Sequence, residues 1–111
     1  MNAGEELEIV DSPERHRYEA RLGDRVVGWV EYGDRDGRRA LVHTEVDPEM
    51  EGRGIGSRLA AGALEDVRRR GVRALVLCPF ISSYLDRHHQ YDDFVDRRRG
   101  GSTRGDATRA D

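Results

Sequence analysis

The stretch VDPEMEGRGIGS, residues 46–57, decides the fold, and its glycines Gly52, Gly54 and Gly56 occupy alternate positions. An apolar pattern with helical spacing begins directly after them. Glycine lets a ligand approach the backbone, and N–H groups that open onto a helix N-terminus form a concave site for an anion. The stretch therefore predicts a strand-to-helix turn that binds phosphate, with Ser57 as a nearby hydroxyl. The alternative interpretation is a turn that only tolerates glycine.

Two other phosphate-binding loops do not fit these glycines. A dinucleotide-binding fingerprint requires G-x-G-x-x-G, whereas residues 52–56 give G-x-G-x-G. A Walker loop requires a lysine, and all 19 basic residues of the chain are arginine. The absence of lysine also excludes Schiff-base chemistry by this chain.

The segment after the glycines predicts an amphipathic helix from Gly54 to Arg70. Its apolar residues fall at spacings of three and four: Ile55, Leu59, Ala63, Leu64 and Val67. Gly71 suits a C-cap, and the arginines at 68–70 suit the negative end of the helix dipole. The arginine triplet therefore needs no ligand to explain it.

Strand patterns lie on both sides of this helix. Alternating polar and apolar residues predict four antiparallel strands, with polar loops at 23–24 and 33–37. The four strands are expected at residues 7–10, 17–22, 26–32 and 40–46. Residues 72–77 form a nearly continuous apolar run that predicts a buried strand, reached by a crossover and therefore parallel to strand 40–46.

The expected fold class is α/β or α+β with a mixed sheet. Antiparallel N-terminal strands precede the glycine-rich loop and central helix, then a parallel strand and short terminal helices at about 80–87 and 91–95 follow. Residues 1–97 are expected to form a single domain. Residues 98–111 have no apolar periodicity and are expected to form a disordered tail.

The composition excludes several classes of protein. With 111 residues, 36% hydrophobic and 37% charged, the chain fits one small domain rather than a large enzyme. Its net charge of −3 argues against nucleic acid as a partner. No stretch is apolar enough to span a membrane, residues 1–10 lack the pattern of a signal peptide, and the single Cys78 cannot form an intrachain disulfide. We therefore expect a cytoplasmic protein.

Several motifs resemble a known enzyme superfamily. Val46-Asp47-Pro48 followed by Gly54 and Gly56 resembles motif A of the GNAT N-acetyltransferases, commonly written Q/R-x-x-G-x-G/A after V-x-P. Glu51 stands where that motif has Gln or Arg. Together with residues 43–46 and the stretch LCPFISSYL at 77–85, the motif resembles the compact stand-alone YjdJ-type branch. The resemblance covers about residues 7–95.

The resemblance implies an acetyl-CoA-dependent N-acetyltransferase of GNAT-like fold. It places the pyrophosphate of acetyl-CoA, the co-substrate, at the glycine loop and the pantetheine arm between strands 40–46 and 72–77. No metal is expected, because His88 and His89 lack further residues at ligand spacing. The expected cofactor-binding residues are Val46, Glu51, Gly52, Arg53, Gly54, Ile55, Gly56 and Ser57.

Four residues are candidates for the chemistry. Glu45 is the first candidate base, and His43, on the same strand face, is either the base or a group that orients Glu45. The resemblance implies that Tyr84 protonates the departing thiolate. Cys78 is expected near the acetyl group, with transient acetylation as the less favoured option. Each also has a purely structural interpretation, as a surface carboxylate, a strand histidine, a core tyrosine or a buried thiol.

The expected acceptor is an amine, and the short chain favours a peptide or protein amine over an enclosed small molecule. The sequence does not indicate the oligomeric state. The competing functional hypothesis is a module that binds CoA or acetyl-CoA, or another protein, with little turnover. A third hypothesis is a small α/β domain whose glycine loop binds no nucleotide.

Overall fold

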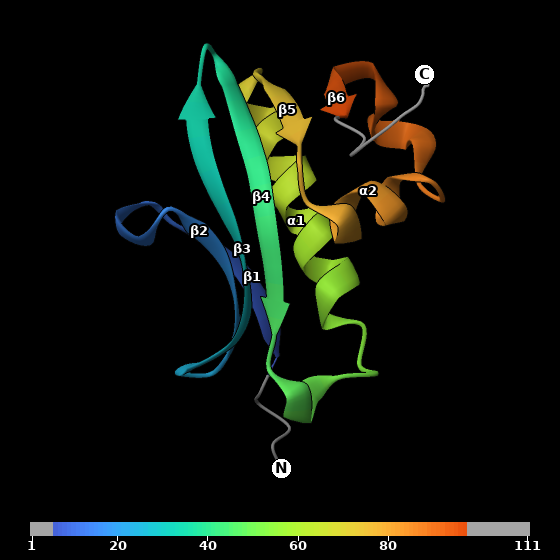
Figure 1. Cartoon of the computed structure of the whole chain (residues 1–111). Helices are drawn as coiled ribbons and strands as arrows, with labels where there is room; N and C mark the ends of the chain where they lie inside the picture. Colours follow the sequence, from blue (N-terminus) through green and yellow to red (C-terminus); the bar gives the residue numbers. More distant parts are fainter. Residues whose placement is uncertain (1–5, 98–111) are drawn as a thin grey trace.

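The computed structural model describes residues 6–97, and the expected disordered tail at 98–111 lies outside the described residues. The described chain forms one six-stranded mixed sheet with two α-helices (Figure 1). The sheet order is β1-β2-β3-β4-β5-β6, antiparallel from β1 to β4 and parallel from β4 to β6. The strands are β1 (Leu7–Ser12), β2 (Arg17–Leu22), β3 (Arg25–Arg35), β4 (Arg38–Val46), β5 (Arg73–Val76) and β6 (Val95–Arg97). This arrangement confirms the expected α+β class with a mixed sheet.

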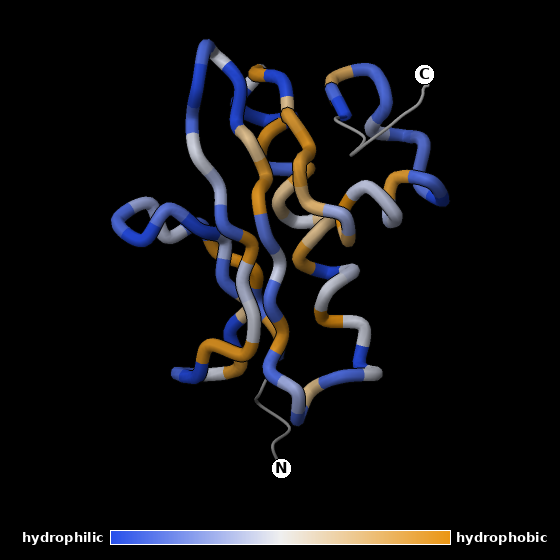
Figure 2. Tube along the Cα trace, viewed as in Figure 1, coloured by the Kyte–Doolittle hydropathy of each residue, from blue (hydrophilic) through white to orange (hydrophobic). Residues whose placement is uncertain are grey.

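The helices connect the parallel part of the sheet. They are α1 (Ile55–Arg70) and α2 (Pro79–Leu85), and three short 3-10 helices are η1 (Pro13–Arg15), η2 (Pro48–Met50) and η3 (His89–Phe94). Helix α1 buries its predicted apolar stripe against the sheet, because Leu59, Leu64 and Val67 are fully buried. Figure 2 shows that β5 is mostly hydrophobic, as expected of a strand with a neighbour on each side.

The connection between β3 and β4 differs from the expected loop at residues 33–37. Strand β3 continues to Arg35, and only Asp36 and Gly37 form the turn, with φ values of 55° and 76°. An Asp-Gly pair with positive φ suits a tight two-residue hairpin turn. Asp34 is held within the strand by two hydrogen bonds from Arg39, of 2.7 and 2.9 Å. The polar composition of residues 33–35 did not indicate that they belong to β3.

Two other expectations are corrected at the C-terminal side. The segment expected to be helical at 91–95 is a 3-10 helix that ends at Phe94, and Val95 begins β6. Strand β6 was not expected, because three residues are too few to show a periodic pattern. It pairs with β5 from Ala74↔Val95 to Val76↔Arg97.

The sheet has one face covered by α1 and one face turned away from it. The Tyr18 hydroxyl donates a 2.7 Å hydrogen bond to Asp66 of α1, so Tyr18 lies on the covered face. Successive side chains along a strand point to opposite faces, so Glu19, which follows Tyr18, lies on the other face. Its partners across the sheet, Trp29 and Glu45, lie on that face too. Among the described residues, no helix packs on this open face of β2, β3 and β4 (Figure 1).

Glu19 is buried on the open face beneath arginine side chains. Its carboxylate is 2.8 Å from Arg17 Nε and 2.7 Å from Arg21 Nη2, and the whole residue is 1% exposed. Burial raises the pKa of this carboxyl, but the hydrogen bonds from Arg21 and Arg17 lower it, and the net pKa lies below its usual value. Folding therefore favours the ionised form of Glu19.

Acid is expected to destabilise the fold through this carboxyl. A lowered pKa in the folded state adds stability that is present above the unfolded pKa, about 4.3, and is lost as pH falls through the folded pKa. We expect the urea midpoint to fall as the pH is lowered from about 6 towards 3. Glu19→Gln should lower the midpoint at pH 6 and flatten this acid dependence. Equal acid dependence in the two proteins would contradict the role given to Glu19.

Candidate active site

Strands β4 and β5 separate midway along β4. They pair from Arg38↔Arg73 to Leu41↔Val76, and there the ladder ends. The Leu41 carbonyl oxygen accepts hydrogen bonds from the N–H groups of both Leu77, at 2.9 Å, and Cys78, at 3.1 Å. The chain then turns into α2, whereas β4 continues to Val46 with β3 as its only strand neighbour among the described residues. The backbone of residues 42–46 of β4 therefore has no strand partner on the side of β5, and this unpaired edge is called the gap below.

The expected buried strand at 72–77 is correspondingly shorter, because its last residue belongs to this divergence. Strand β5 spans only Arg73–Val76. Leu77 is 37% exposed, although its apolar character suggested a buried strand residue. Leu77 is exposed because it follows the last residue of β5 that pairs with β4.

The glycine loop lies at the far end of β4. Gly52 and Gly54 have φ values of 84° and 75°, in the left-handed region that favours glycine. Gly54 is the N-cap of α1, and no atom lies within 4 Å of the position that a Cβ would take there. The backbone at the helix N-terminus therefore faces open space. Unpaired N–H groups and the helix dipole favour an anion at this end.

A groove of about 320 Å³ runs along this loop. It is lined by Val46, Met50, Glu51, Gly52, Gly54, Ile55, Gly56, Ser57 and Phe80. The structure thus brings together seven of the eight residues expected to bind the cofactor. The eighth, Arg53, lines an adjoining hollow with Ser57 and Tyr84.

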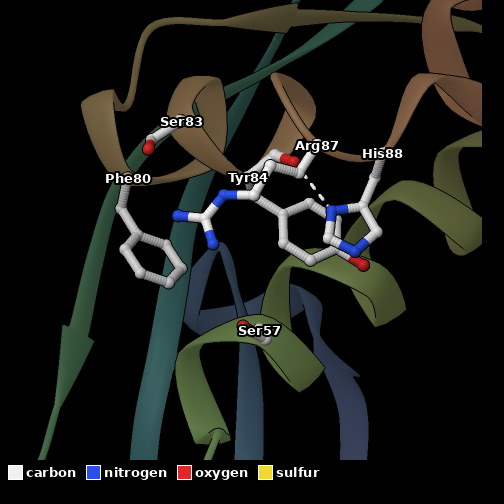
Figure 3. Close-up of a pocket in the computed structure, with 6 residues that line it drawn as sticks. All are labelled: Ser57, Phe80, Ser83, Tyr84, Arg87 and His88. Carbon is white, nitrogen blue, oxygen red and sulfur yellow. Dashed lines mark hydrogen bonds between the residues drawn. The ribbon is translucent and has the colours of Figure 1, made fainter.

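Phe80 forms a wall of the groove that sequence reasoning missed. Its ring packs on Gly56, where a Cβ would lie 2.7 Å from a ring atom, so only glycine fits beneath the ring. Phe80 also lines a second hollow with Ser57, Tyr84 and His88 (Figure 3). The aromatic residue directly after Cys78-Pro79 was the available signal in the sequence.

Three large hydrophobic residues are exposed within the described chain, and all three follow or border the divergence. They are Val42 and Phe80, each 44% exposed, and Leu77. Val42 and Leu77 directly follow the last residues that pair between β4 and β5, and Phe80 is the second residue of α2. The gap therefore has an apolar border, which suits an apolar ligand segment.

His43 and Glu45 are joined on the open face of β4. His43 Nε2 lies 2.8 Å from Glu45 Oε1, and about half of each side chain is exposed. Both residues lie on the part of β4 that has separated from β5. A carboxylate that holds an imidazole nitrogen in this way can accept a proton from a group approaching from solvent.

Tyr84 lies on α2, packed flat against His88. The two rings are stacked with centroids 3.9 Å apart, and His88 Nδ1 lies 2.8 Å from the Tyr84 carbonyl oxygen. In Figure 3 the Tyr84 hydroxyl lies beside His88, away from Phe80, and the Arg87 guanidinium extends towards Phe80. Among the described residues, no hydrogen bond or ring contact joins Tyr84 to Glu45, His43 or Cys78.

Cys78 lies at the divergence, and its thiol is buried. The residue is 2% exposed, and Sγ lies 3.1 Å from Thr44 Oγ1 on β4. The Thr44 side chain lies on the face covered by α1, whereas the Glu45 side chain lies on the open face. The thiol therefore links β4 to the start of α2 and is not presented to solvent. Within residues 6–97, no group of three or more His, Cys, Asp and Glu side chains could hold a metal ion.

The sequence profile of the GCN5-related N-acetyltransferases matches residues 17–94, most of the described chain. The chain belongs to the GCN5-related N-acetyltransferase family. The matched region of the chain includes the β4–β5 divergence, the glycine loop, Cys78 and Tyr84. No curated protein matches the chain by sequence.

A solved structure shows the same fold for this family member. A GCN5-like N-acetyltransferase candidate from Staphylococcus aureus, known from solution NMR, is 20% identical with a TM-score of 0.63, over 89% of this chain and 97% of that one. A GNAT-family candidate from Desulfovibrio desulfuricans is 30% identical over 52% of this chain and 41% of its own, with a TM-score of 0.47. A soil-metagenome aminoglycoside acetyltransferase, solved with trehalose, is 16% identical over 88% and 76%, with a TM-score of 0.49.

The described helices of this family member show no membrane-spanning character. Within the part of the chain that the structure describes, neither α1 nor α2 has the length and apolar composition needed to cross a bilayer.

Proposed function

We propose that the chain transfers an acetyl group from acetyl-CoA to an amine by direct attack. The observation that carries this proposal is the groove at the N-terminus of α1, which is bordered by Val46 at the end of β4 and by Phe80 of α2. A pyrophosphate suits the groove, because Gly54 leaves the helix N-terminus open to an anion. The pantetheine arm suits the gap, where β4 has no strand neighbour on the side of β5.

The residues around the groove and the gap provide the remaining contacts. The backbone of Gly52, Gly54 and Gly56 approaches the phosphates, and Arg53 and Ser57 add a positive charge and a hydroxyl beside them. Phe80 covers the groove from the side of α2. Val42 and Leu77 surround the acetyl end with apolar groups, which excludes water from the thioester.

The His43–Glu45 pair is the proposed base. Glu45, held by His43 at 2.8 Å, accepts a proton from the acceptor ammonium group and releases it to solvent. The neutral amine then forms a C–N bond at the thioester carbonyl carbon, and the C–S bond breaks. The amine loses a second proton when the amide forms, and the departing thiolate takes up one proton to become the CoA thiol. Tyr84 is the proposed donor to that sulfur, and the amine proton restores its hydroxyl after a side-chain rotation away from His88.

Cys78 is proposed to shape the gap rather than to carry the acetyl group. Its thiol is buried and within 3.1 Å of the Thr44 hydroxyl, so it lacks the exposure that a nucleophilic thiolate needs. We assign residues 1–97 to one acetyltransferase domain of the compact YjdJ-type branch. The similar size of the Staphylococcus aureus protein, of which 97% is covered, supports the branch. The single free cysteine supports a cytoplasmic setting.

A module that binds acetyl-CoA with little turnover is the second candidate. The open sheet face favours it, because no described helix encloses an acceptor there. The test is incubation of the full chain with acetyl-CoA and a lysine-containing peptide, followed by mass spectrometry and thiol detection. We expect one acetyl group on the peptide for each CoA thiol released. Binding without either product would establish the module and overturn the transferase.

A further inference from the structure

The open face of β3 and β4 carries a block of four side chains beside the gap. Trp29 lies directly opposite Glu45, and Glu31 lies directly opposite His43. Trp29 Nε1 donates a 3.1 Å hydrogen bond to Glu31 Oε2, just as His43 contacts Glu45 along the other strand. These four residues, called the β3–β4 block below, are thereby held in place before any partner arrives.

The charge of this block is negative and directed to solvent. Each carboxylate has one oxygen in use, and within the described residues Glu31 Oε1 and Glu45 Oε2 have no hydrogen-bond partner. Neither carboxylate is paired with an arginine in the described chain. The acidic side chains therefore retain the capacity to accept hydrogen bonds from a cation.

The neighbouring strand limits where a cation can bind. Arg17 lies 4.5 Å from the centroid of the Trp29 ring and is held by Glu19 at 2.8 Å. With Arg15 and Arg21 it makes the β2 side of the open face basic. A cationic partner is therefore directed to Glu31 and Glu45 rather than to the Trp29 ring or to β2.

The spacing of the two carboxylates matches an extended peptide. Glu31 and Glu45 are diagonal neighbours on an antiparallel pair, which places them about 7–8 Å apart. Residues two positions apart in an extended chain are separated by about 7 Å and point to the same side. The flat, uncovered face accepts such a segment without enclosing it.

We infer that the β3–β4 block is the acceptor site and binds an extended basic peptide segment of another protein. The acceptor lysine lies at Glu45, and a second positive residue two positions away lies at Glu31, which makes Glu31 a specificity-determining residue. This inference rests on the proposed function for the role of Glu45. Its test uses binding, so that it can fail separately from acetyl transfer.

Trp29 is the one tryptophan of the chain, so its fluorescence reports on the block directly. The full chain is titrated with a blocked peptide that has lysine at the centre and arginine two positions away, and with the same peptide carrying glutamine instead of arginine. We expect a saturable fluorescence change, with about fivefold weaker binding of the glutamine peptide. Salt should weaken binding of the arginine peptide more strongly.

Two matched variants complete the test. Glu31→Gln should weaken binding of the arginine peptide about fivefold and leave binding of the glutamine peptide unchanged, so that the preference disappears. Glu8→Gln removes an exposed carboxylate from β1 at the far side of the sheet and should leave both affinities unchanged. Absence of a saturable change, equal affinity for the two peptides, or tighter binding of spermidine than of the arginine peptide would overturn the inference. Failure of acetyl transfer with intact peptide preference would overturn the proposed function alone.

Discussion

Gly54→Glu is expected to abolish binding of acetyl-CoA, with a loss of at least about a hundredfold in affinity. The glutamate carboxylate would project from the N-cap of α1 into the space proposed for the pyrophosphate. Two like charges about 4 Å apart repel by about 4 kcal/mol near a protein surface, which exceeds the energy of a hundredfold change. Isothermal titration calorimetry with acetyl-CoA measures the effect.

Gly37→Glu is the matched control for backbone strain. Gly37 has a φ of 76°, close to the 75° of Gly54, and its Cβ position is equally open. It lies in the β3–β4 turn, away from the groove. Both variants should lose about 1–2 kcal/mol of folding stability, because a side chain is unfavourable in the left-handed region. Only Gly54→Glu should lose acetyl-CoA binding, and unchanged affinity in that variant would refute the pyrophosphate assignment.

Glu45→Gln should lower kcat for acetyl transfer by about a hundredfold to ten-thousandfold, the usual contribution of a general base. The amide keeps the shape of the side chain and its contact with His43, but it cannot accept the proton of the acceptor. The affinity for acetyl-CoA should remain unchanged, because Glu45 lies on the open face and does not line the groove. Initial rates of CoA thiol release measure kcat.

Glu14→Gln is the control for this substitution. Glu14 is an exposed carboxylate in η1 and takes no part in the proposed chemistry. Raising the pH should restore part of the lost rate of Glu45→Gln, because a larger fraction of the acceptor amine is then already neutral. If Glu45→Gln retained the kcat of the unaltered chain at neutral pH, Glu45 would not be the base.

The fold could largely be predicted from local patterns. The helical spacing after Gly54 and the alternation in β2 carry strong periodic signals. The extension of β3 to Arg35 and strand β6 could not be predicted in this way. In β3, Arg39 on the other side of the turn holds the polar Asp34 in the strand, and in β6 three residues give no period.

The residues that line the candidate groove could be predicted from the sequence in the glycine loop, but not on the side of α2. The glycines and the residues between them indicated the groove because they are contiguous in sequence. Phe80 and Leu77 could not be placed, since their exposure depends on the turn that follows the shared hydrogen bonds of the Leu41 carbonyl. The opposition of Glu31 and His43 likewise depends on the register of two strands, which includes a bulge after Glu31.

Calorimetric titration of the full chain with acetyl-CoA tests most directly whether the groove at Gly54 binds the pyrophosphate. A short acetyl thioester that lacks the nucleotide is the matched ligand. We predict saturable heat with acetyl-CoA and at least about tenfold weaker binding of the short thioester, because the pyrophosphate supplies charge-assisted hydrogen bonds at the helix N-terminus. Absence of binding, or equal affinity for the two thioesters, would contradict the account.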